Sequence, residues 1–269
     1  MKINLLLILS FFLESTKYLT TKNSGNGFGS QYQVMLSALA LAEHQGAEFV
    51  FNPLSACAHN YSSDSLFVEK LNDFMGLRNK FKSASDFESD ILGKKEKLNI
   101  TDYGCIYFVD RNVDAWLKVK QKARLAYFSS PKPKLPFYHN LKNVAVHVRR
   151  RNVEDIRETF LYDRYYFDIM NKIKTKYTNA CFHIYSQVDP AIATKKTKCI
   201  SNFDIYKKKF SAKLHLDKSI EETFHAMVMA DILVTSDSSF SYAAALLSEG
   251  EIYYHKFWHS PMPYWKIFG

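Results

Sequence analysis

The sequence has few cysteines and none of the close pairs that hold metals or redox disulfides. No CxxC spacing occurs among the four cysteines, Cys57, Cys105, Cys181 and Cys199, so the zinc and redox motifs built on such pairs are excluded. Cys105 and Cys181 lie inside the apolar runs GCIYFV and ACFHIY, where cysteine usually acts as a small buried hydrophobic residue. We therefore expect no disulfide framework.

The amino terminus lacks an apolar run of membrane-spanning length. Leu5–Leu13, LLLILSFFL, is far shorter than the roughly 18 to 20 apolar residues of a spanning helix. It resembles the apolar core of a secretory signal, yet no small-residue cleavage site follows before Glu14. For residues 1–16, an uncleaved signal, a peripheral membrane-associating segment and an extra buried helix all stay open. The location stays open too, between the secretory-pathway lumen and the cytoplasm.

Acidic residues are in deficit. Lys plus Arg number 36 against 27 Asp plus Glu, giving a net charge of +9, which favours anionic partners. The basic runs 94–97, 118–124, 195–198 and 207–209 are dispersed, as is typical of solvated faces, and no zinc-finger or RNA-binding sheet motif is present. We therefore expect no nucleic-acid partner. The hydrophobic fraction of 47% indicates a globular chain.

From Lys17 onward, strand and helix signals alternate. A strand at 18–21, a glycine loop at 25–29, a helix at 32–44 and a strand at 48–51 predict a βαβ unit. A buried strand at 105–109 and a helix at 113–127 follow. Pro131, Pro133 and Pro136 then mark a semi-rigid linker that ends near residue 138.

Beyond the linker the same alternation resumes. It predicts strands near 143–148, 180–185, 213–216, 232–235 and 251–254, with helices near 161–176, 219–230 and 239–248. The expected fold is α/β, with two Rossmann-like domains, 17–138 and 139–269, facing across a cleft.

The segment NVAVHVRRR, residues 143–151, is a β-branched strand that ends in a histidine and arginines. Ligands of open α/β sheets bind beyond the carboxyl ends of strands, so His147, Arg149 and Arg150 are expected to point into that crevice. Arginine's fork of donors can bridge two phosphate oxygens. The alternative is a solvated turn with structural ion pairs to Glu154 and Asp155.

Two further polar turns follow predicted strands. After 180–185, Ser186 and Gln187 can line the same crevice, although a surface turn explains them equally well. After ILVT, the turn SDSSFS offers hydroxyls and backbone amides to a phosphate through Ser238 and Ser239. Helix capping by Asp237 or Ser238 is the alternative, and it needs only one of these residues.

The glycine loop NSGNGFGSQ joins a strand to a helix, so its amides can approach an anionic ligand closely. Ordinary tight-turn glycines are the competing explanation. The acidic residue that a nicotinamide site needs is missing, because Glu43 lies inside the predicted helix. The candidate residues of this loop are Gly25, Asn26, Gly27, Gly29 and Gln31.

These clusters, in this order, resemble the α1,2-, α1,6- and protein O-fucosyltransferase group, which shares HxRR and a late SSFS-type segment. HVRR, ETFHAMVMADILVTSDSSFSYAAALLS and GFGSQYQVMLSALALAEHQGAEF carry the resemblance. It implies a GT-B fold, GDP-fucose as donor, inverting transfer to a glycan or protein hydroxyl, and no metal or other cofactor.

Carried over by position, the resemblance assigns roles. Arg149 would bind the β-phosphate as the catalytic residue, with Arg150 in support, and His147 would contact the guanine side. Ser238 and Ser239 would complete the phosphate cradle. The group's guanine-binding acid falls in register with Thr223, with Glu222 one residue earlier.

The chain departs from the group at Asn152, where HxRRxD has an aspartate, and at Ser30, where asparagine is common. Another nucleotide sugar as donor and a non-catalytic nucleotide- or glycan-binding relative are the alternatives. The base that deprotonates the acceptor is unassigned, with Glu154, Asp155, His44 and His59 as candidates.

An aromatic segment, FWHSPMPYW, closes the chain. Aromatic faces stack on sugars, but return of the segment to pack on the amino-terminal domain is the commoner arrangement.

Overall fold

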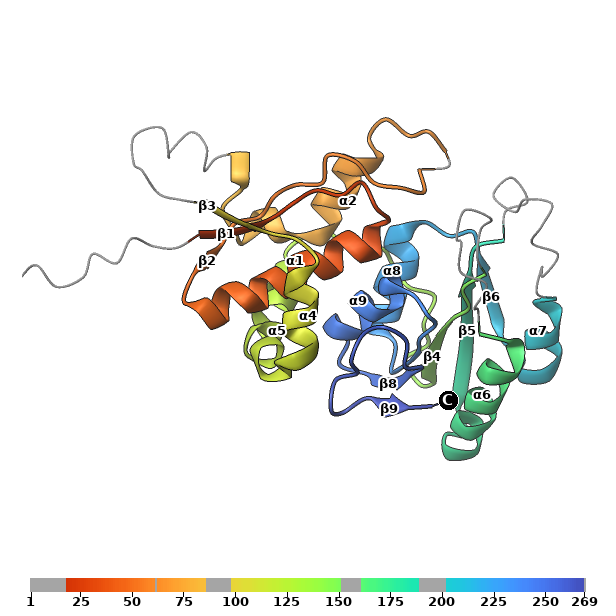
Figure 1. The fold of residues 1–269 in the computed structure, drawn as a ribbon. Helices are drawn as coiled ribbons and strands as arrows, with labels where there is room; N and C mark the ends of the chain where they lie inside the picture. The colour runs from red at the N-terminus through yellow and green to blue at the C-terminus, as the bar shows by residue number, and fades with distance from the viewer. Residues whose placement is uncertain (1–17, 61, 86–97, 151–160, 189–201, 269) are drawn as a thin grey trace, which may run out of the picture.

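The computed structural model describes residues 18–60, 62–85, 98–150, 161–188 and 202–268 (Figure 1). Within these residues the chain forms two parallel sheets, with strand orders β2-β1-β3 and β6-β5-β4-β7-β8-β9. The predicted α/β class with two Rossmann-like, parallel-sheet units is confirmed. Leu5–Leu13, Cys199, Glu154, Asp155, Asn152 and the basic runs 94–97 and 195–198 lie outside the described residues.

The first sheet is built on the predicted βαβ unit. β1 (Tyr18–Thr21), α1 (Phe28–Gln45) and β2 (Glu48–Phe49) follow one another as expected, and α1 begins four residues earlier than predicted. Gly46, with φ +63°, ends α1 in the left-handed conformation that glycine adopts without strain. The residue pattern did not predict α2 (Phe67–Met75), the 3₁₀ turn η1 (Leu77–Asn79) or β3 (Leu98–Thr101).

The predicted strand at 105–109 is wrong, because these residues form helix α4 (Gly104–Arg111). Cys105, Ile106 and Val109 are its buried residues, a spacing that fits one helix face. The Asp102 carboxylate accepts a hydrogen bond from the Gly104 N–H at 2.9 Å, just ahead of the helix. A short apolar run does not distinguish a strand from a buried helix. The helix α5 (Val113–Tyr127) has the predicted bounds.

The second sheet contains all five predicted strands of the carboxyl-terminal half. Its three predicted helices are present as α6 (Asp163–Lys176), α8 (Ile220–Met229) and α9 (Ser239–Leu247). The lysine-rich helix α7 (Asp204–Phe210) and the two-residue strand β9 (Lys266–Ile267) were not predicted. The five strands are β4 (Lys142–His147), β5 (Ala180–Ser186), β6 (Lys213–Leu216), β7 (Ile232–Val234) and β8 (Glu251–Tyr254).

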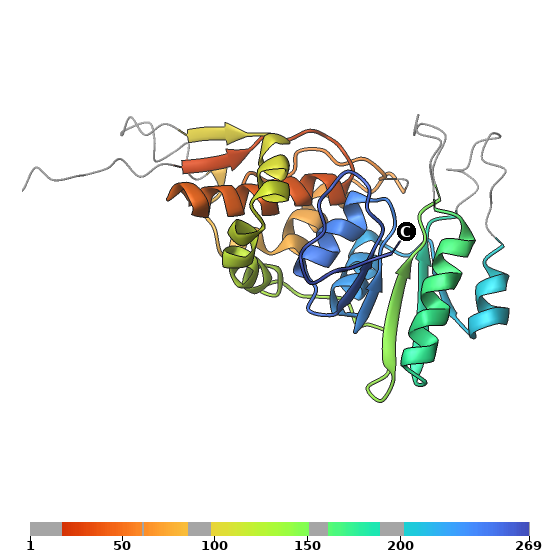
Figure 2. The ribbon, with the colours of Figure 1, turned by 60° about the horizontal axis from the view of Figure 1, so that its bottom comes forward.

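The order of the second sheet reverses between β4 and β7. From β4 the chain adds β5 and β6 on one side, then returns to place β7 and β8 on the other. Helices α6 and α7 cover the outer face of this sheet, and α8 and α9 cover the face toward the first unit (Figure 2). The reversal creates a topological switch point, where ligands of open α/β sheets bind.

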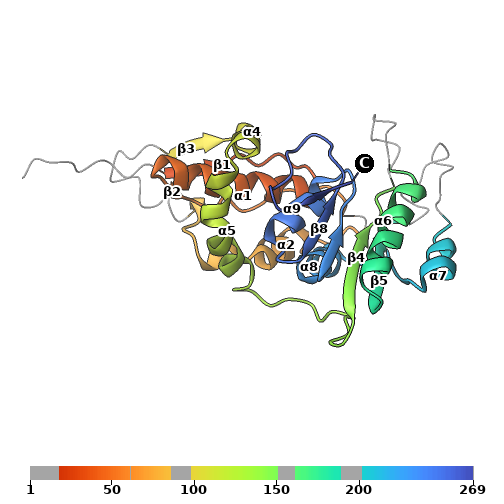
Figure 3. The ribbon, with the colours of Figure 1, turned by 90° about the horizontal axis from the view of Figure 1, so that it is seen from below.

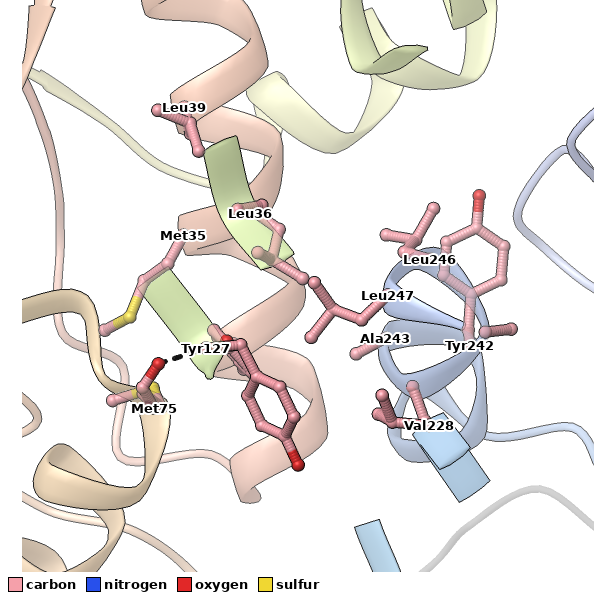
Figure 4. Close-up of a cluster of buried hydrophobic side chains, with 14 of the residues drawn as sticks. Met35, Leu36, Leu39, Met75, Tyr127, Val228, Tyr242, Ala243, Leu246 and Leu247 are labelled. Atoms are coloured by element: carbon pink, nitrogen blue, oxygen red, sulfur yellow. Dashed lines mark hydrogen bonds between the residues drawn. The ribbon is translucent and has the colours of Figure 1, made fainter. Parts of the chain in front are cut away.

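The two units share one hydrophobic core. Helix α9 lies against α1, and Figure 3 shows α8 and α9 between the helices of the first unit and the second sheet. Figure 4 shows Leu36 and Leu39 of α1 in one cluster with Ala243 and Leu247 of α9. The division at residue 138 stays a prediction, because this core runs through both halves of the chain.

A close backbone contact lies at the start of this helix pair. A Cβ atom on Gly29 would lie 2.5 Å from the Phe240 nitrogen and closer still to its Cα. The Phe28 ring packs edge-on against Phe224 at 5.3 Å, and the Phe224 ring lies 5.4 Å from Phe240. The glycine and the aromatic cluster together bring the start of α1 to the start of α9.

The aromatic segment at the carboxyl end packs on the first unit, which is the more common of the two arrangements considered for it. The Ser260 N–H donates to the Asp110 carboxylate of α4 at 3.0 Å, and the His259 Nδ1 lies 3.5 Å from the same carboxylate. Trp265 is buried, whereas Trp258 is 55% exposed. Packing, rather than sugar stacking, accounts for most of this segment.

The linker between α5 and β4 contains no helix or strand and is fastened to the first unit. The Lys132 Nζ donates to the Phe74 carbonyl at 2.8 Å and lies 4.2 Å from the centroid of the Tyr127 ring. Burial lowers the pKa of Lys132 to about 8. A lysine beside the last turn of α2 also fits the negative end of that helix's dipole.

Glu251 joins α6, β8 and β9 in a charged cluster. Its carboxylate accepts from the Lys176 Nζ at 3.0 Å, the Tyr177 hydroxyl at 2.9 Å and the Lys266 Nζ. Burial alone would raise the pKa of Glu251, but these hydrogen bonds outweigh it and lower the pKa to about 2. The carboxylate therefore stabilises the folded state while it is charged.

We expect the stabilisation from Glu251 to disappear in acid. The folded pKa is below the ordinary value of 4.5, so the contribution is complete above about pH 4.5 and lost as pH falls toward about 2. Glu251→Gln should lower the urea midpoint at pH 7, and the difference from wild type should shrink through that window. Asp168→Asn removes an exposed pair at 3.7 Å and should show no such trend. A constant difference for Glu251→Gln would contradict the assignment.

Candidate functional site

The carboxyl ends of β4 and β7 lie side by side at the switch point. Val144 pairs with Ile232 and Val146 with Val234, so the residues after His147 and after Val234 emerge together. HVRR and SDSSFS, about 90 positions apart in the sequence, are therefore neighbours, as expected for strands adjacent in a parallel sheet.

Arg149 and the amino terminus of α9 converge on one hydroxyl. The Arg149 Nη1 donates to the Ser238 Oγ at 3.2 Å, and the Phe240 N–H donates to the same oxygen at 3.3 Å. Ser238 is thus the N-cap of α9, which confirms the capping role considered for it. A half-buried cation beside the positive end of a helix is a favourable setting for an anion.

The other serines of the turn have distinct surroundings. The Ser241 Oγ lies 3.2 Å from the Ser238 carbonyl and 3.3 Å from the Ser236 carbonyl, and accepts from the Ser236 N–H. These bonds shape the turn. Ser239 is the first residue of α9 and is partly exposed. Asp237 does not cap the helix; its carboxylate meets the His255 Nδ1 at 2.9 Å.

His147 lies beneath this turn as a neutral imidazole. Its Nδ1 is 2.9 Å from the Ser236 Oγ, and its ring is edge-on to Phe240 at 5.7 Å. Burial, with a smaller contribution from the charge on Arg149, lowers the pKa of His147 to about 3. At neutral pH it therefore adds hydrogen-bonding capacity without adding charge.

Arg150 braces the end of β4 against α6. It forms an ion pair with Asp163 and donates to the Leu161 carbonyl at 3.1 Å, with its side chain only 10% exposed. Asp163 also accepts from the Tyr206 hydroxyl at 2.7 Å. This arrangement fits the supporting role predicted for Arg150 better than direct contact with a ligand.

The predicted polar residues after β5 separate into two kinds. The Ser186 Oγ donates to the Val148 carbonyl at 2.6 Å and so ties the ends of β5 and β4 together. Gln187 is exposed. The Ser186 hydroxyl is committed to the backbone, and the Gln187 amide faces solvent at the same edge of the sheet.

Glu222 and Thr223 lie in the first turn of α8. Ser219 and Glu222 form a capping box: the Glu222 N–H donates to the Ser219 Oγ at 3.1 Å, and the Ser219 N–H donates to the Glu222 carboxylate at 3.4 Å. Burial and, secondarily, the Glu222 charge raise the pKa of Tyr185, which pairs with His147 across the sheet. The charge of Glu222 therefore acts on the carboxyl end of β5, and Thr223 beside it is partly exposed.

The glycine loop reaches this site because α1 starts against α9. Gly25 needs its left-handed φ of +70°, and a Cβ on Gly27 would lie 3.1 Å from the His59 ring. The Gln31 Nε2 donates to the Asn26 carbonyl at 2.7 Å and to the Ala56 carbonyl at 3.0 Å, which holds the loop. These predicted loop residues thus shape or hold the loop. Gly29 allows the close contact with the Phe240 backbone.

The candidate bases differ in their distance from the turn. His44 lies at the exposed end of α1, about 24 Å along the helix axis from Phe28, and is too far from Ser238 to act there. His59 lies beside the glycine loop, against Gly27. Of the two described candidates, only His59 is near the site.

Several residues of the site were not predicted. Ser236 and Phe240 lie within the quoted SDSSFS turn, but their contacts depend on β4 and α1. Tyr103 bonds to the Asn26 side chain, and its hydroxyl lies 3.2 Å from the Ser30 Oγ. One feature of the sequence could have pointed to His255, because it directly follows the predicted strand EIYY.

Two features are absent from the described residues. No group of three or more His, Cys, Asp or Glu side chains among them could hold a metal ion. None of the helices in the described parts of the chain combines the length and apolar character needed to cross a bilayer.

Comparisons with known proteins show only distant likeness. No family model and no curated protein sequence matches the chain. A mutant of Arabidopsis thaliana FUT1 bound to GDP is 12% identical over 93% of this chain and 73% of that chain, with a TM-score of 0.43. E. coli heptosyltransferase WaaC with ADP-2-deoxy-2-fluoro heptose is 11% identical over 94% and 92%, with a TM-score of 0.43.

The fucosyltransferase NodZ from Bradyrhizobium is 10% identical to the chain, over 87% of this chain and 93% of its own, with a TM-score of 0.38. At this level of identity and TM-score, these likenesses carry no argument about the chemistry of the site.

Proposed function

We propose that this protein is a glycosyltransferase that transfers a sugar from a nucleotide sugar to a hydroxyl group. The observation that supports it most is the convergence of Arg149 and the amino terminus of α9 on Ser238 at the switch point. A diphosphate placed there would meet the Arg149 cation and the positive end of the α9 dipole together.

The reaction we propose is inverting and independent of metal. As the bond between the sugar and the diphosphate breaks, negative charge grows on the leaving phosphate. Arg149 and the helix dipole of α9 would stabilise that charge, with Ser238 and Ser239 completing the cradle. Arg150 would hold the end of β4 in place through Asp163. The acceptor would approach from the side of residues 17–138.

The donor we propose is GDP-fucose, and the acceptor a glycan or protein hydroxyl. The carboxyl end of β5 and the first turn of α8 are adjacent to the phosphate cradle, which fits a nucleobase next to Ser186, Gln187 and Thr223. His147, buried and neutral, is also on this edge of the sheet. The HVRR and SDSSFS motifs are the support for fucose.

The hydrogen bond of Glu222 favours a second candidate donor. Its carboxylate already accepts from the Ser219 N–H, so a guanine N1 and N2 would have to compete with this capping bond. Another nucleotide sugar would keep the phosphate cradle and differ at this position. A non-catalytic relative would keep nucleotide binding and show no turnover of any donor.

We expect GDP to raise the melting temperature of the purified protein more than UDP, ADP or CMP, with and without magnesium. A ligand that binds only the folded state stabilises it by mass action. Hydrolysis of GDP-fucose and other nucleotide sugars then separates an enzyme from a binding protein. A larger shift with another nucleotide would replace GDP-fucose, as the proposed donor, by a sugar carried on that nucleotide. No shift with any nucleotide would overturn the proposal.

A further inference from the structure

The outward face of α5 carries large apolar side chains alongside the exposed polar residues Asp114 and Gln121. Leu117 is 42% exposed, Leu125 is 67% exposed, and Phe128, directly after the helix, is 40% exposed. Their spacing puts them along one side of the helix. The opposite side is fully committed to the core through Trp116, Val119, Ala123 and Tyr127.

This apolar strip continues onto α8. The Phe128 ring lies 6.2 Å from the His225 ring, and Met229, one helical turn beyond His225, is 46% exposed. We call Leu117, Leu125, Phe128 and Met229 the α5 strip. In Figure 3 the outward side of α5 is not covered by another element of the described chain.

Lysines flank the strip on one side. Lys118 and Lys122 are exposed on the same outward face of α5. Lys122 is 3.9 Å from Glu43, at the limit of an ion pair, and Lys118 forms no ion pair with any described residue. Such exposed pairs are weak and leave the lysine charge available to an external anion.

The other basic residues of the helix have structural partners. The Lys120 Nζ donates to the Ser248 carbonyl at 2.8 Å, beyond the last turn of α9. The Arg124 side chain is 2.9 Å from Glu249 and also bonds to the Leu247 carbonyl. The basic run 118–124 is therefore divided between an inward pair that fastens α5 to α9 and an outward pair beside the strip.

Apolar side chains with a lysine border fit a lipid surface better than a protein. Lysine is depleted in protein interfaces, and the strip exposes only on the order of a few hundred Å², well under a stable interface of about 800 Å² per partner. At an anionic bilayer, the apolar side chains enter the boundary region and each nearby lysine adds to the attraction.

We propose that the α5 strip, with Lys118 and Lys122, docks the protein peripherally on anionic membrane surfaces. Leu117, Leu125 and Phe128 enter the interface while the lysines contact lipid phosphates. The contact is separate from the nucleotide site, because α5 meets α9 at its carboxyl-terminal end, whereas Ser238 lies at its amino-terminal end. It places α5 and the carboxyl-terminal end of α8 against the membrane.

The test is co-sedimentation of the full chain with vesicles of phosphatidylcholine alone or mixed with phosphatidylglycerol. We expect wild type to prefer the anionic vesicles, and the preference to fall as NaCl rises from about 0.1 M to about 0.5 M. Leu125→Glu should weaken binding at least about tenfold, because it puts a carboxylate into the strip beside anionic lipid. Leu125→Trp should show a blue shift of its added fluorescence when vesicles are present.

Ile100→Glu is the matched control. Ile100 is 68% exposed on β3, on the opposite side of α1 from α5 (Figure 1), and its substitution should leave vesicle binding unchanged. Equal binding of wild type to both vesicle types, or equal losses for Leu125→Glu and Ile100→Glu, would overturn the proposal. So would a wild-type dimer in the absence of lipid that Leu125→Glu dissociates, since the strip would then be an interface between two copies.

Discussion

Replacing Arg149 with alanine is expected to weaken nucleotide binding at least about 100-fold while the protein stays folded, because each charge-assisted hydrogen bond contributes about 1.5 to 3 kcal/mol. Arg149 is half-buried, donates to the hydroxyl of Ser238 and does not belong to the hydrophobic clusters, so its removal leaves the apolar core intact. Calorimetric titration with GDP measures the loss, and an unchanged melting temperature without ligand checks the fold.

Two further variants separate the role of Arg149 from net charge. Arg149→Lys keeps the charge but loses the fork that can bridge two phosphate oxygens, so its affinity should fall between wild type and alanine. Arg164→Ala removes an arginine whose side chain is 91% exposed on α6, and its affinity should equal that of wild type. Equal affinities for Arg149→Ala and wild type would remove Arg149 from the site.

The second large effect is expected at Gly29, where alanine should destabilise the protein by more than about 3 kcal/mol, above the usual range for an overpacked core. The added Cβ would meet the backbone of Phe240, 2.5 Å from its nitrogen, and backbone cannot move away as a side-chain tip can. Separation of α1 from α9 would then open the core shared by the two units. The urea midpoint measures this loss.

Gly104→Ala is the matched control for Gly29. Gly104 opens the helix α4, and the nearest atom to its added Cβ would be the Asp102 Oδ1 at 3.4 Å, an ordinary contact. Alanine there should be neutral or stabilise the protein slightly, because it is a better helix former. If Gly29→Ala were as stable as Gly104→Ala, the close contact between α1 and α9 would be wrong.

The strand and helix pattern of the second half was predictable because its periodicity is strong. Val144, Val146 and Val148 alternate into a buried strand that leads to HVRR, and SDSSFS follows the apolar strand ILVT. The run GCIYFV was not predictable, because a short apolar run fits a buried strand and a buried helix equally well. Ser219 and Glu222 fit the S-x-x-E pattern that is typical of a capping box, and they form one. Because the capping bond engages the Glu222 carboxylate, it competes with a nucleobase-binding role for Glu222.

By itself the sequence determined which polar residues stand at which strand ends, because local periodicity and turn residues act over a few positions. Only the tertiary structure decided which of these residues meet. The pairing of β4 with β7 brings Arg149 to Ser238, and the contact of Gly29 with Phe240 brings the glycine loop to the same turn. Strand order and close helix packing depend on contacts between distant parts of the chain, and no local pattern encodes them.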